Sequence, residues 1–165
     1  MQLFWTHILK LKIITKNSND PNNPIYLDAV KYFLRILLND VDYEHVERID
    51  IKVDSVMSDF GECFIRKLKN KKITVRIKVK KGLSFIQTLL TLAHESTHAE
   101  QFITKRLVIA KSGMWYWNNN AYGEMPYLGL KQDEIYDILP WEREAVYKET
   151  ELFLQYMNYY IESNS

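Results

Sequence analysis

The chain is 165 residues long, 47% hydrophobic and carries a formal net charge of +1. This length suits one globular domain, residues 1–165, and is too short for two. The near-neutral charge argues against a protein that coats nucleic acid or a membrane surface. Cys63 is the single cysteine, which rules out an intrachain disulfide and favours a reducing, cytoplasmic setting. No apolar run reaches the roughly twenty residues that cross a bilayer, so we expect no membrane association.

The N-terminal part of the chain predicts a strand, a loop and a helix. Residues 1–15 are apolar but lack the small-residue cleavage site of a signal peptide. Within them, residues 9–13 alternate between apolar side chains and lysine, which is typical of a strand with one buried face. Turn-forming residues dominate 17–24 and indicate a loop. A helix over 25–39 follows from four apolar residues at helical spacing: Val30, Phe33, Leu34 and Leu37.

Three strands are expected next. Residues 47–57 alternate between apolar and polar side chains, and residues 61–68 and 72–79 predict a hairpin across a Lys-Asn-Lys-Lys turn. The basic residues of 66–81 are interleaved with apolar ones, which favours a solvated outer sheet face over a nucleic-acid surface. We expect strand 72–79 to offer a sheet edge that an extended peptide could join.

The C-terminal half predicts two helices with an irregular segment between them. Ser84 is a suitable N-cap for a helix over 85–105. Glycine, proline and asparagine interrupt residues 111–138, and Pro140 can open a final helix to about residue 161. The aromatic segment 114–120 either forms a lid or specificity wall, or uses its tryptophans to close the core.

The motif that carries chemistry is His94-Glu95-Ser96-Thr97-His98, a HExxH sequence inside the predicted helix 85–105. Histidines four residues apart lie on one helical face, so both imidazoles can bind one zinc ion, and the glutamate between them can lie beside the reacting water. These are the minimal parts of a zinc hydrolase, usually a peptidase. The histidines continue an apolar stripe, so we expect the site to open at the end of the core. The stripe consists of Ile86, Leu90, Ala93, Thr97 and Gln101.

A catalytic zinc usually takes three protein ligands, and the third can come from three places. The metzincin pattern HExxHxxGxxH requires glycine and histidine where Gln101 and Thr104 stand, so that class is excluded. A histidine would have to be His7 or His45, and His45 lies in a polar segment typical of a surface. The remaining source is a glutamate on the final helix.

Glu142 and Glu144 both lie near the start of that helix. Either could be there only because carboxylates are favourable at a helix N-terminus. Glu144 lies about 200° around the helix from Glu142. Glu142 shares its face with the residues most able to pack inward: Ala145, Val146, Glu149, Phe153, Tyr156 and Tyr160.

HExxH followed by a Glu-x-x-Ala helix resembles the minimal gluzincin zinc peptidases. The longer pattern, Pro-x-Glu-x-Glu-Ala after His-Glu-x-x-His-Ala-x-Gln, resembles small metallopeptidases of phages and bacteria. The resemblance spans roughly residues 84–160. It implies a zincin-like α+β fold in which a small antiparallel or mixed sheet packs on the active-site helix and a C-terminal helix. It also implies a Zn²⁺ ion with three ligands: His94, His98 and Glu142.

The same resemblance implies roles for further residues. Glu95 would be the general base that hydrolyses a peptide bond in a peptide or protein substrate, and a small residue at Ala145 would let the two helices approach. Many gluzincins orient a zinc-bound histidine with Asp or Asn where this chain has Val146, and Glu100 stands where the strict motif prefers an apolar residue. An oxyanion donor could be one of four tyrosines: Tyr122, Tyr127, Tyr136 or Tyr147.

Two other functions remain open from the sequence. One is a zinc-binding module that keeps the fold without catalysis. The other is a nucleic-acid-associated module that uses the basic hairpin, although the composition argues against nucleic acid as the partner. The oligomeric state has no signature in the sequence.

Overall fold

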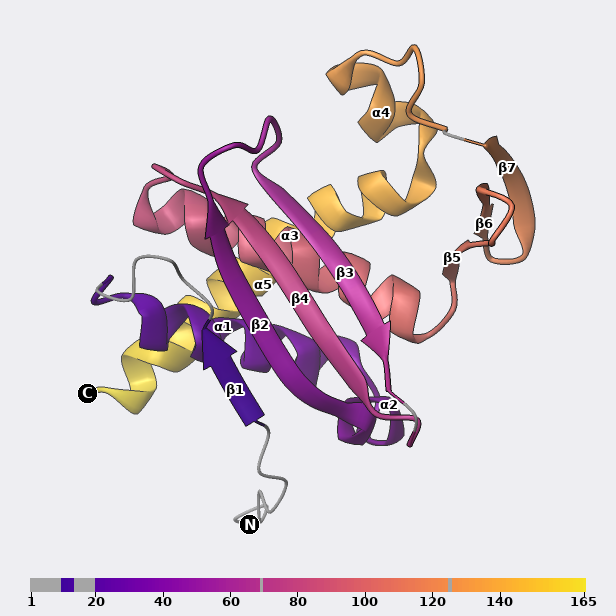
Figure 1. Cartoon of the computed structure of the whole chain (residues 1–165). Helices are drawn as coiled ribbons and strands as arrows, with labels where there is room; N and C mark the ends of the chain where they lie inside the picture. The colour runs from indigo at the N-terminus through magenta and orange to yellow at the C-terminus, as the bar shows by residue number, and fades with distance from the viewer. Residues whose placement is uncertain (1–9, 14–19, 69, 125) are drawn as a thin grey trace.

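A four-stranded mixed sheet, with helices on one of its faces, makes up most of the described chain (Figure 1). The computed structural model describes residues 10–13, 20–68, 70–124 and 126–165. His7, Leu9 and most of the expected N-terminal segment and loop lie outside these residues. The elements follow in this order: β1 (Lys10–Ile13), α1 (Asn23–Leu37), α2 (Asp40–His45), β2 (Val46–Asp54), β3 (Gly61–Lys67), β4 (Ile73–Lys80), α3 (Phe85–Ile103), β5 (Leu107–Ile109), β6 (Met114–Trp117), β7 (Asn120–Glu124), α4 (Gln132–Ile138) and α5 (Pro140–Ser163).

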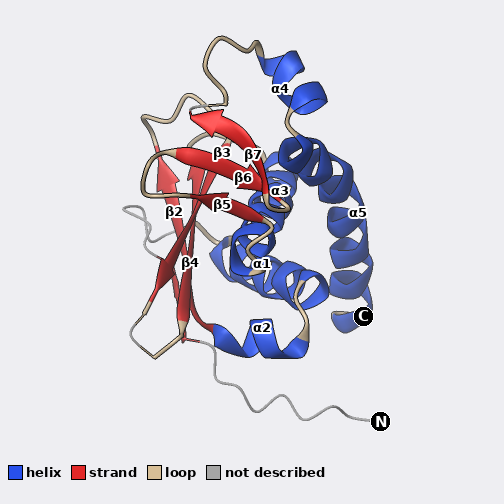
Figure 2. Cartoon of the chain, turned by 90° about the vertical axis from the view of Figure 1, so that its right-hand side faces the viewer, coloured by secondary structure: helices blue, strands red, loops and turns tan. Residues whose placement is uncertain are grey.

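The main sheet has the strand order β1-β2-β4-β3, in which the first three strands are parallel and β3 is antiparallel to β4. Helices α1 and α3 lie against its inner face, and α5 packs behind them as a third layer (Figure 2). The apolar row of β4, which alternates as the sequence predicted, faces these helices. That row is buried: Ile73, Val75, Ile77 and Val79. The α+β class is therefore confirmed.

The prediction that strand 72–79 lies at a sheet edge is wrong. This segment forms β4, which bonds to β2 on one side and to β3 on the other. Its inward row is buried throughout, as suits a central strand, whereas β3 alternates between half-buried and exposed residues. The edge strand next to β4 is therefore β3, and β1 lies at the opposite edge of the sheet.

The outer face of the sheet carries charged side chains that pair with one another. Asp50 is only 1% exposed and accepts a hydrogen bond from Arg48 at 2.6 Å and a longer one from Arg76 at 3.5 Å. Lys78 pairs with Glu62 across β3 and β4 at 3.0 Å. The interleaved basic residues thus lie on a polar face, in agreement with the sequence pattern.

Helix α3 begins where the sequence predicted. The Ser84 hydroxyl accepts a hydrogen bond from the Gln87 backbone at 3.2 Å, and the Gln87 side chain accepts one from the Ser84 backbone at 3.0 Å, which together form a capping box. The predicted apolar stripe is only partly correct, because Ile86 at its start is 55% exposed. From Glu95 to Gln101 every residue is buried, so this part of the helix is enclosed by the sheet, α1 and α5.

The segment 111–138, expected to be irregular, contains most of a second sheet and a short helix. Strands β5, β6 and β7 form an antiparallel sheet. Its β6–β7 turn is made by Asn118 and Asn119, both with positive φ, which is the backbone that a two-residue hairpin requires and that asparagine tolerates. The asparagines that suggested a loop are a hairpin turn between strands too short to show alternation.

A second, smaller core lies under this sheet. Trp115 stacks on the fully buried Trp141 with ring centroids 5.7 Å apart, and Trp117 lies against the same indole at 6.2 Å. Both tryptophans therefore close a core, which was one of the two roles open to them. Within the described part of the chain, no helix is both long and apolar enough to span a membrane.

Candidate metal centre

His94, His98 and Glu142 converge on one point between α3 and α5. The Nε2 atoms of the two histidines are 3.1 Å apart, and each lies 3.4 Å from Oε2 of Glu142. Among the described residues, these are the group whose ligand atoms all lie within 4.8 Å of one another. The structure thus brings together the two motif histidines and the glutamate that the helical face favoured.

The spacing of these three atoms fits a tetrahedral ion. Bonds of about 2.0–2.1 Å at tetrahedral angles place ligand atoms about 3.3–3.4 Å apart. Two imidazole nitrogens, one carboxylate oxygen and an open fourth position form the donor set of a catalytic zinc site. The residues present therefore fit Zn²⁺.

Each histidine is oriented through its other ring nitrogen. Nδ1 of His94 lies 2.9 Å from Oε2 of Glu149, and Nδ1 of His98 lies 2.9 Å from Oε1 of Gln101. Both partners accept, so the proton of a neutral imidazole stays on Nδ1 and the Nε2 lone pair faces the ligand cluster. Val146 is exposed, and Glu149 supplies the contact that an Asp or Asn there would have made.

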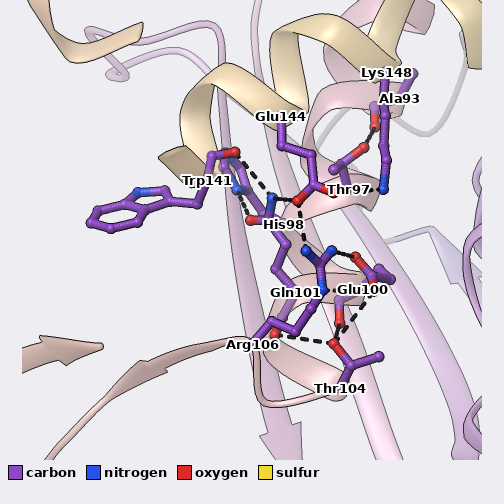
Figure 3. Close-up of polar contacts among 10 residues, drawn as sticks. All are labelled: Ala93, Thr97, His98, Glu100, Gln101, Thr104, Arg106, Trp141, Glu144 and Lys148. Atoms are coloured by element: carbon purple, nitrogen blue, oxygen red, sulfur yellow. Dashed lines mark hydrogen bonds and ion pairs between the residues drawn. The ribbon is translucent and has the colours of Figure 1, made fainter. Parts of the chain in front are cut away.

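Glu144, the alternative ligand, is held away from the cluster (Figure 3). Its carboxylate accepts hydrogen bonds from Arg106 at 2.9 Å and Gln101 at 3.0 Å, and it pairs with Lys148 at 2.9 Å. Arg106 also pairs with the buried Glu100, so an ion pair occupies the position where the motif prefers an apolar residue.

His45, the other described histidine considered as a ligand, lies in α2. It belongs to no group of three potential metal ligands within the described ranges.

Tyr127 fixes the carboxylate of Glu142. Its hydroxyl donates to Oε1 of Glu142 at 2.7 Å and accepts from the Trp141 indole at 2.7 Å. Burial and the nearby Glu142 carboxylate raise the pKa of Tyr127, so it remains a donor. Of the other tyrosines considered, Tyr122 and Tyr147 are exposed, and the side chain of Tyr136 is not among those described. Tyr127 is thus the described tyrosine that contacts the site, and it does so as a positioning residue.

The cluster stabilises a cation between its carboxylates. Burial alone would lower the pKa of His94, but hydrogen bonds to Glu142 and Glu149 outweigh it and raise that pKa to about 10. Burial would raise the pKa of Glu142, yet the hydrogen bonds with His94 and His98 hold it well below its ordinary value. The same fixed negative charge that favours protonated imidazoles would favour a bound metal ion.

Glu95 lies beside the cluster without binding to it. The residue is 6% exposed, and its carboxylate accepts no hydrogen bond from any described residue. It lines the same cleft as the two histidines and Glu142. Burial raises its pKa, while the histidines oppose that rise. A buried carboxylate with a raised pKa and free oxygens is suited to accept and return a proton.

Gly61, the first residue of β3, packs directly against Glu95. A Cβ at this position would lie 2.5 Å from Oε1 and 2.7 Å from Cγ of Glu95, and 2.6 Å from Cγ2 of Thr91. No ordinary Cβ contact is so short. The missing side chain is therefore what allows the edge strand to reach the Glu95 carboxylate.

The chain matches no protein-family model, no curated protein and no solved structure, so the geometry carries the functional argument. Sequence reasoning missed two residues of the site. The role of Glu149 could have been predicted, because this residue lies seven positions after Glu142, two helical turns along the same face. The role of Gly61 could not have been predicted, since the side chain that it contacts, Glu95, lies 34 positions away on another element.

We predict that Tyr127→Phe weakens zinc binding by about 10- to 100-fold, since it removes the hydrogen bond that orients a ligand carboxylate. Competition against a chromogenic chelator measures this affinity. Tyr122→Phe is the matched control, because that ring contacts Trp141 but not Glu142. Equal affinities for the two variants would contradict the positioning role of Tyr127.

We predict that Gly61→Ala lowers the free energy of unfolding by about 1–3 kcal/mol, the usual cost of an overpacked interior. Thermal or chemical denaturation measures the change. The same substitution in a Thr91→Ser, Glu95→Ala background should cost less by about 0.5–3 kcal/mol, because the clashing atoms are gone. Equal costs in both backgrounds would show that Gly61 matters for another reason.

Proposed function

We propose that the protein is a zinc-dependent peptidase with a gluzincin-like site on a zincin-like fold. The observation that carries this proposal is the triangle of two Nε2 atoms and one carboxylate oxygen, with the unpaired Glu95 carboxylate lining the same cleft. Zinc held there would polarise the scissile carbonyl and lower the pKa of the attacking water. The single cysteine favours placing this activity inside the cell.

The residues of this chain would then divide the work. His94, His98 and Glu142 hold the ion, and Glu95 takes the proton of the attacking water and returns it to the leaving amine. Tyr127 is already bonded to Glu142 and Trp141, so we assign it to orientation of the ligand and not to the oxyanion.

The edge strand β3 supports a peptide as substrate. Phe60 accepts a backbone hydrogen bond from Lys80 at 2.8 Å, and Gly61 lies opposite Val79 in the antiparallel register. In such a ladder, bonded and unbonded positions alternate, so the backbone groups of Gly61, Cys63 and Ile65 point away from β4. All three residues line the cleft, and an extended peptide could add to this edge as a further strand.

The first test is metal content. The purified protein should hold one zinc per chain, and His94→Ala and Glu142→Ala should each lose it, because both remove one of three ligands. Elemental analysis after dialysis against trace metal-free buffer measures this. Glu144→Gln, matched in position on the helix, should retain the ion. Loss in Glu144→Gln with retention in Glu142→Ala would reverse the ligand assignment.

The second test is catalysis. Glu95→Gln should keep zinc and fold but lose about 10²- to 10⁴-fold in kcat, the range attributed to general acid–base catalysis. Cleavage of a quenched fluorescent peptide library measures activity, with Glu151→Gln on the exposed side of α5 as the control. A protein that binds zinc yet behaves identically with and without Glu95 would be a binding module and not an enzyme.

A further inference from the structure

The cleft in front of the candidate metal centre is large and mostly apolar. Its volume is about 950 Å³, at the upper end of the range for small-ligand sites. One wall is β3 with the residue before it, and the other is the second core. Phe60 and Ile65 belong to the first wall, and Leu107, Trp115 and Ile135 to the second. Bulky apolar side chains on both sides of the site would be complementary to these walls.

Apart from the two candidate ligand histidines, the titratable side chains that line this cleft and carry charge are all carboxylates. Among the described residues, no lysine or arginine lines it. Two basic side chains near the site, Arg106 and Lys148, form ion pairs with Glu144, which does not line the cleft. The carboxylates of the lining are Asp59, Glu62, Glu95, Glu142 and Glu149.

A bound divalent cation would not neutralise this surface. The two positive charges of the ion would balance the negative charges of Glu95 and Glu142. Three carboxylates would remain: Glu149, which contacts His94, Glu62 in β3, and Asp59 just before it. Lys78 offsets the charge of Glu62 through an ion pair at 3.0 Å. The cleft therefore stays negative, and an acidic group entering it meets repulsion without a counterion.

We infer, on the basis of the proposed function, that the substrate is an internal polypeptide segment. Its residues next to the scissile bond are bulky and apolar, and its flanking residues are neutral or basic. A chain end is disfavoured at the carboxyl side because, in the part of the chain that the structure describes, no lysine or arginine lines the cleft to bind a terminal carboxylate. The free edge from Gly61 to Ile65 covers four steps of about 3.3 Å each, long enough to pair with about five extended residues that continue in both directions.

Binding and cleavage of one matched peptide set test this inference. The peptides have ten residues, acetylated and amidated ends, one apolar centre, and flanks of lysine, glutamine or glutamate; a second set has free ends. Binding is measured by fluorescence anisotropy with zinc-loaded Glu95→Gln protein, and cleavage with the wild type. Lysine flanks should bind about tenfold tighter than glutamate flanks at low salt, and the difference should shrink at about 0.5 M salt, because screening weakens exposed charges.

Charge-reversal variants locate the source of the preference. Asp59→Lys combined with Glu62→Lys should reduce the tenfold difference to less than about twofold. Glu151→Lys combined with Glu162→Lys is the control, since it changes the net charge equally on exposed positions of α5 outside the cleft. An equal effect of both pairs would show that the preference reflects net charge and would overturn the inference.

The outcomes separate this inference from the proposed function. The expected ranking in binding with no cleavage of any peptide would refute the peptidase and leave the selectivity of the cleft standing. Tighter binding of glutamate flanks, binding of none of the peptides, or cleavage that requires a free amino or carboxyl end would overturn the inference. The last of these results would leave the peptidase intact.

Discussion

The candidate site depends on one buried amide, that of Gln101. Its oxygen accepts a hydrogen bond from Nδ1 of His98 at 2.9 Å, and its nitrogen donates to the backbone carbonyl of Trp141 and to Glu144, both at 3.0 Å. The side chain is completely buried, so each of these bonds lies where an unpaired polar group would be costly. A single residue thus orients a histidine of α3 and ties α3 to the first turn of α5, one residue before Glu142.

Small residues and the aromatic core make this close approach compatible with packing. Ala93 and Ala145 are fully buried, and their small side chains let α3 and α5 approach closely enough for polar side chains to meet between them. On the other side, Trp141 and Tyr127 place the second core directly behind Glu142. The ligand cluster is therefore held by bonded neighbours from both helices and from the aromatic segment, which is the arrangement that a preformed site requires.

Periodicity explains which parts of this structure could be predicted from the sequence. Three local patterns correspond to the structure. They are the alternation along β4, the N-cap at Ser84, and the position of His94 and of Glu142 on the inward face of its own helix. The order of the strands is not local: β4 is central because β2 pairs with it, and no residue in either strand encodes that choice alone. For the same reason Gly61 has no signature in its neighbourhood, since the atoms that exclude a side chain there belong to Glu95 and Thr91.

The second sheet could not be predicted from the sequence for a different physical reason. Its strands are three to five residues long, too short for alternation between apolar and polar residues to be distinguished from chance. In addition, aromatic residues lie on both faces, so the alternation is absent. Its stability comes from the rings gathered around Trp141, which are contacts across the fold. The glutamine at position 101 shows the same limit, because two of its three partners, Trp141 and Glu144, lie on α5 and are known only once that helix is placed.

The segment between α3 and α5 leaves one helix and returns to the other at neighbouring points, as the bond from Gln101 to Trp141 shows. The two ends of this segment therefore lie close together, and a change in its length would alter the entropy of loop closure only slightly. Of its residues, Tyr127 bonds to Glu142 and Arg106 to Glu144, whereas Leu107, Ile109, Trp115 and Ile135 line the cleft through apolar side chains. Side chains of this segment that line the cleft without filling the second core, such as Ile109, could therefore differ between related chains and change what the cleft accepts, while the helices that carry His94, His98 and Glu142 stay unchanged.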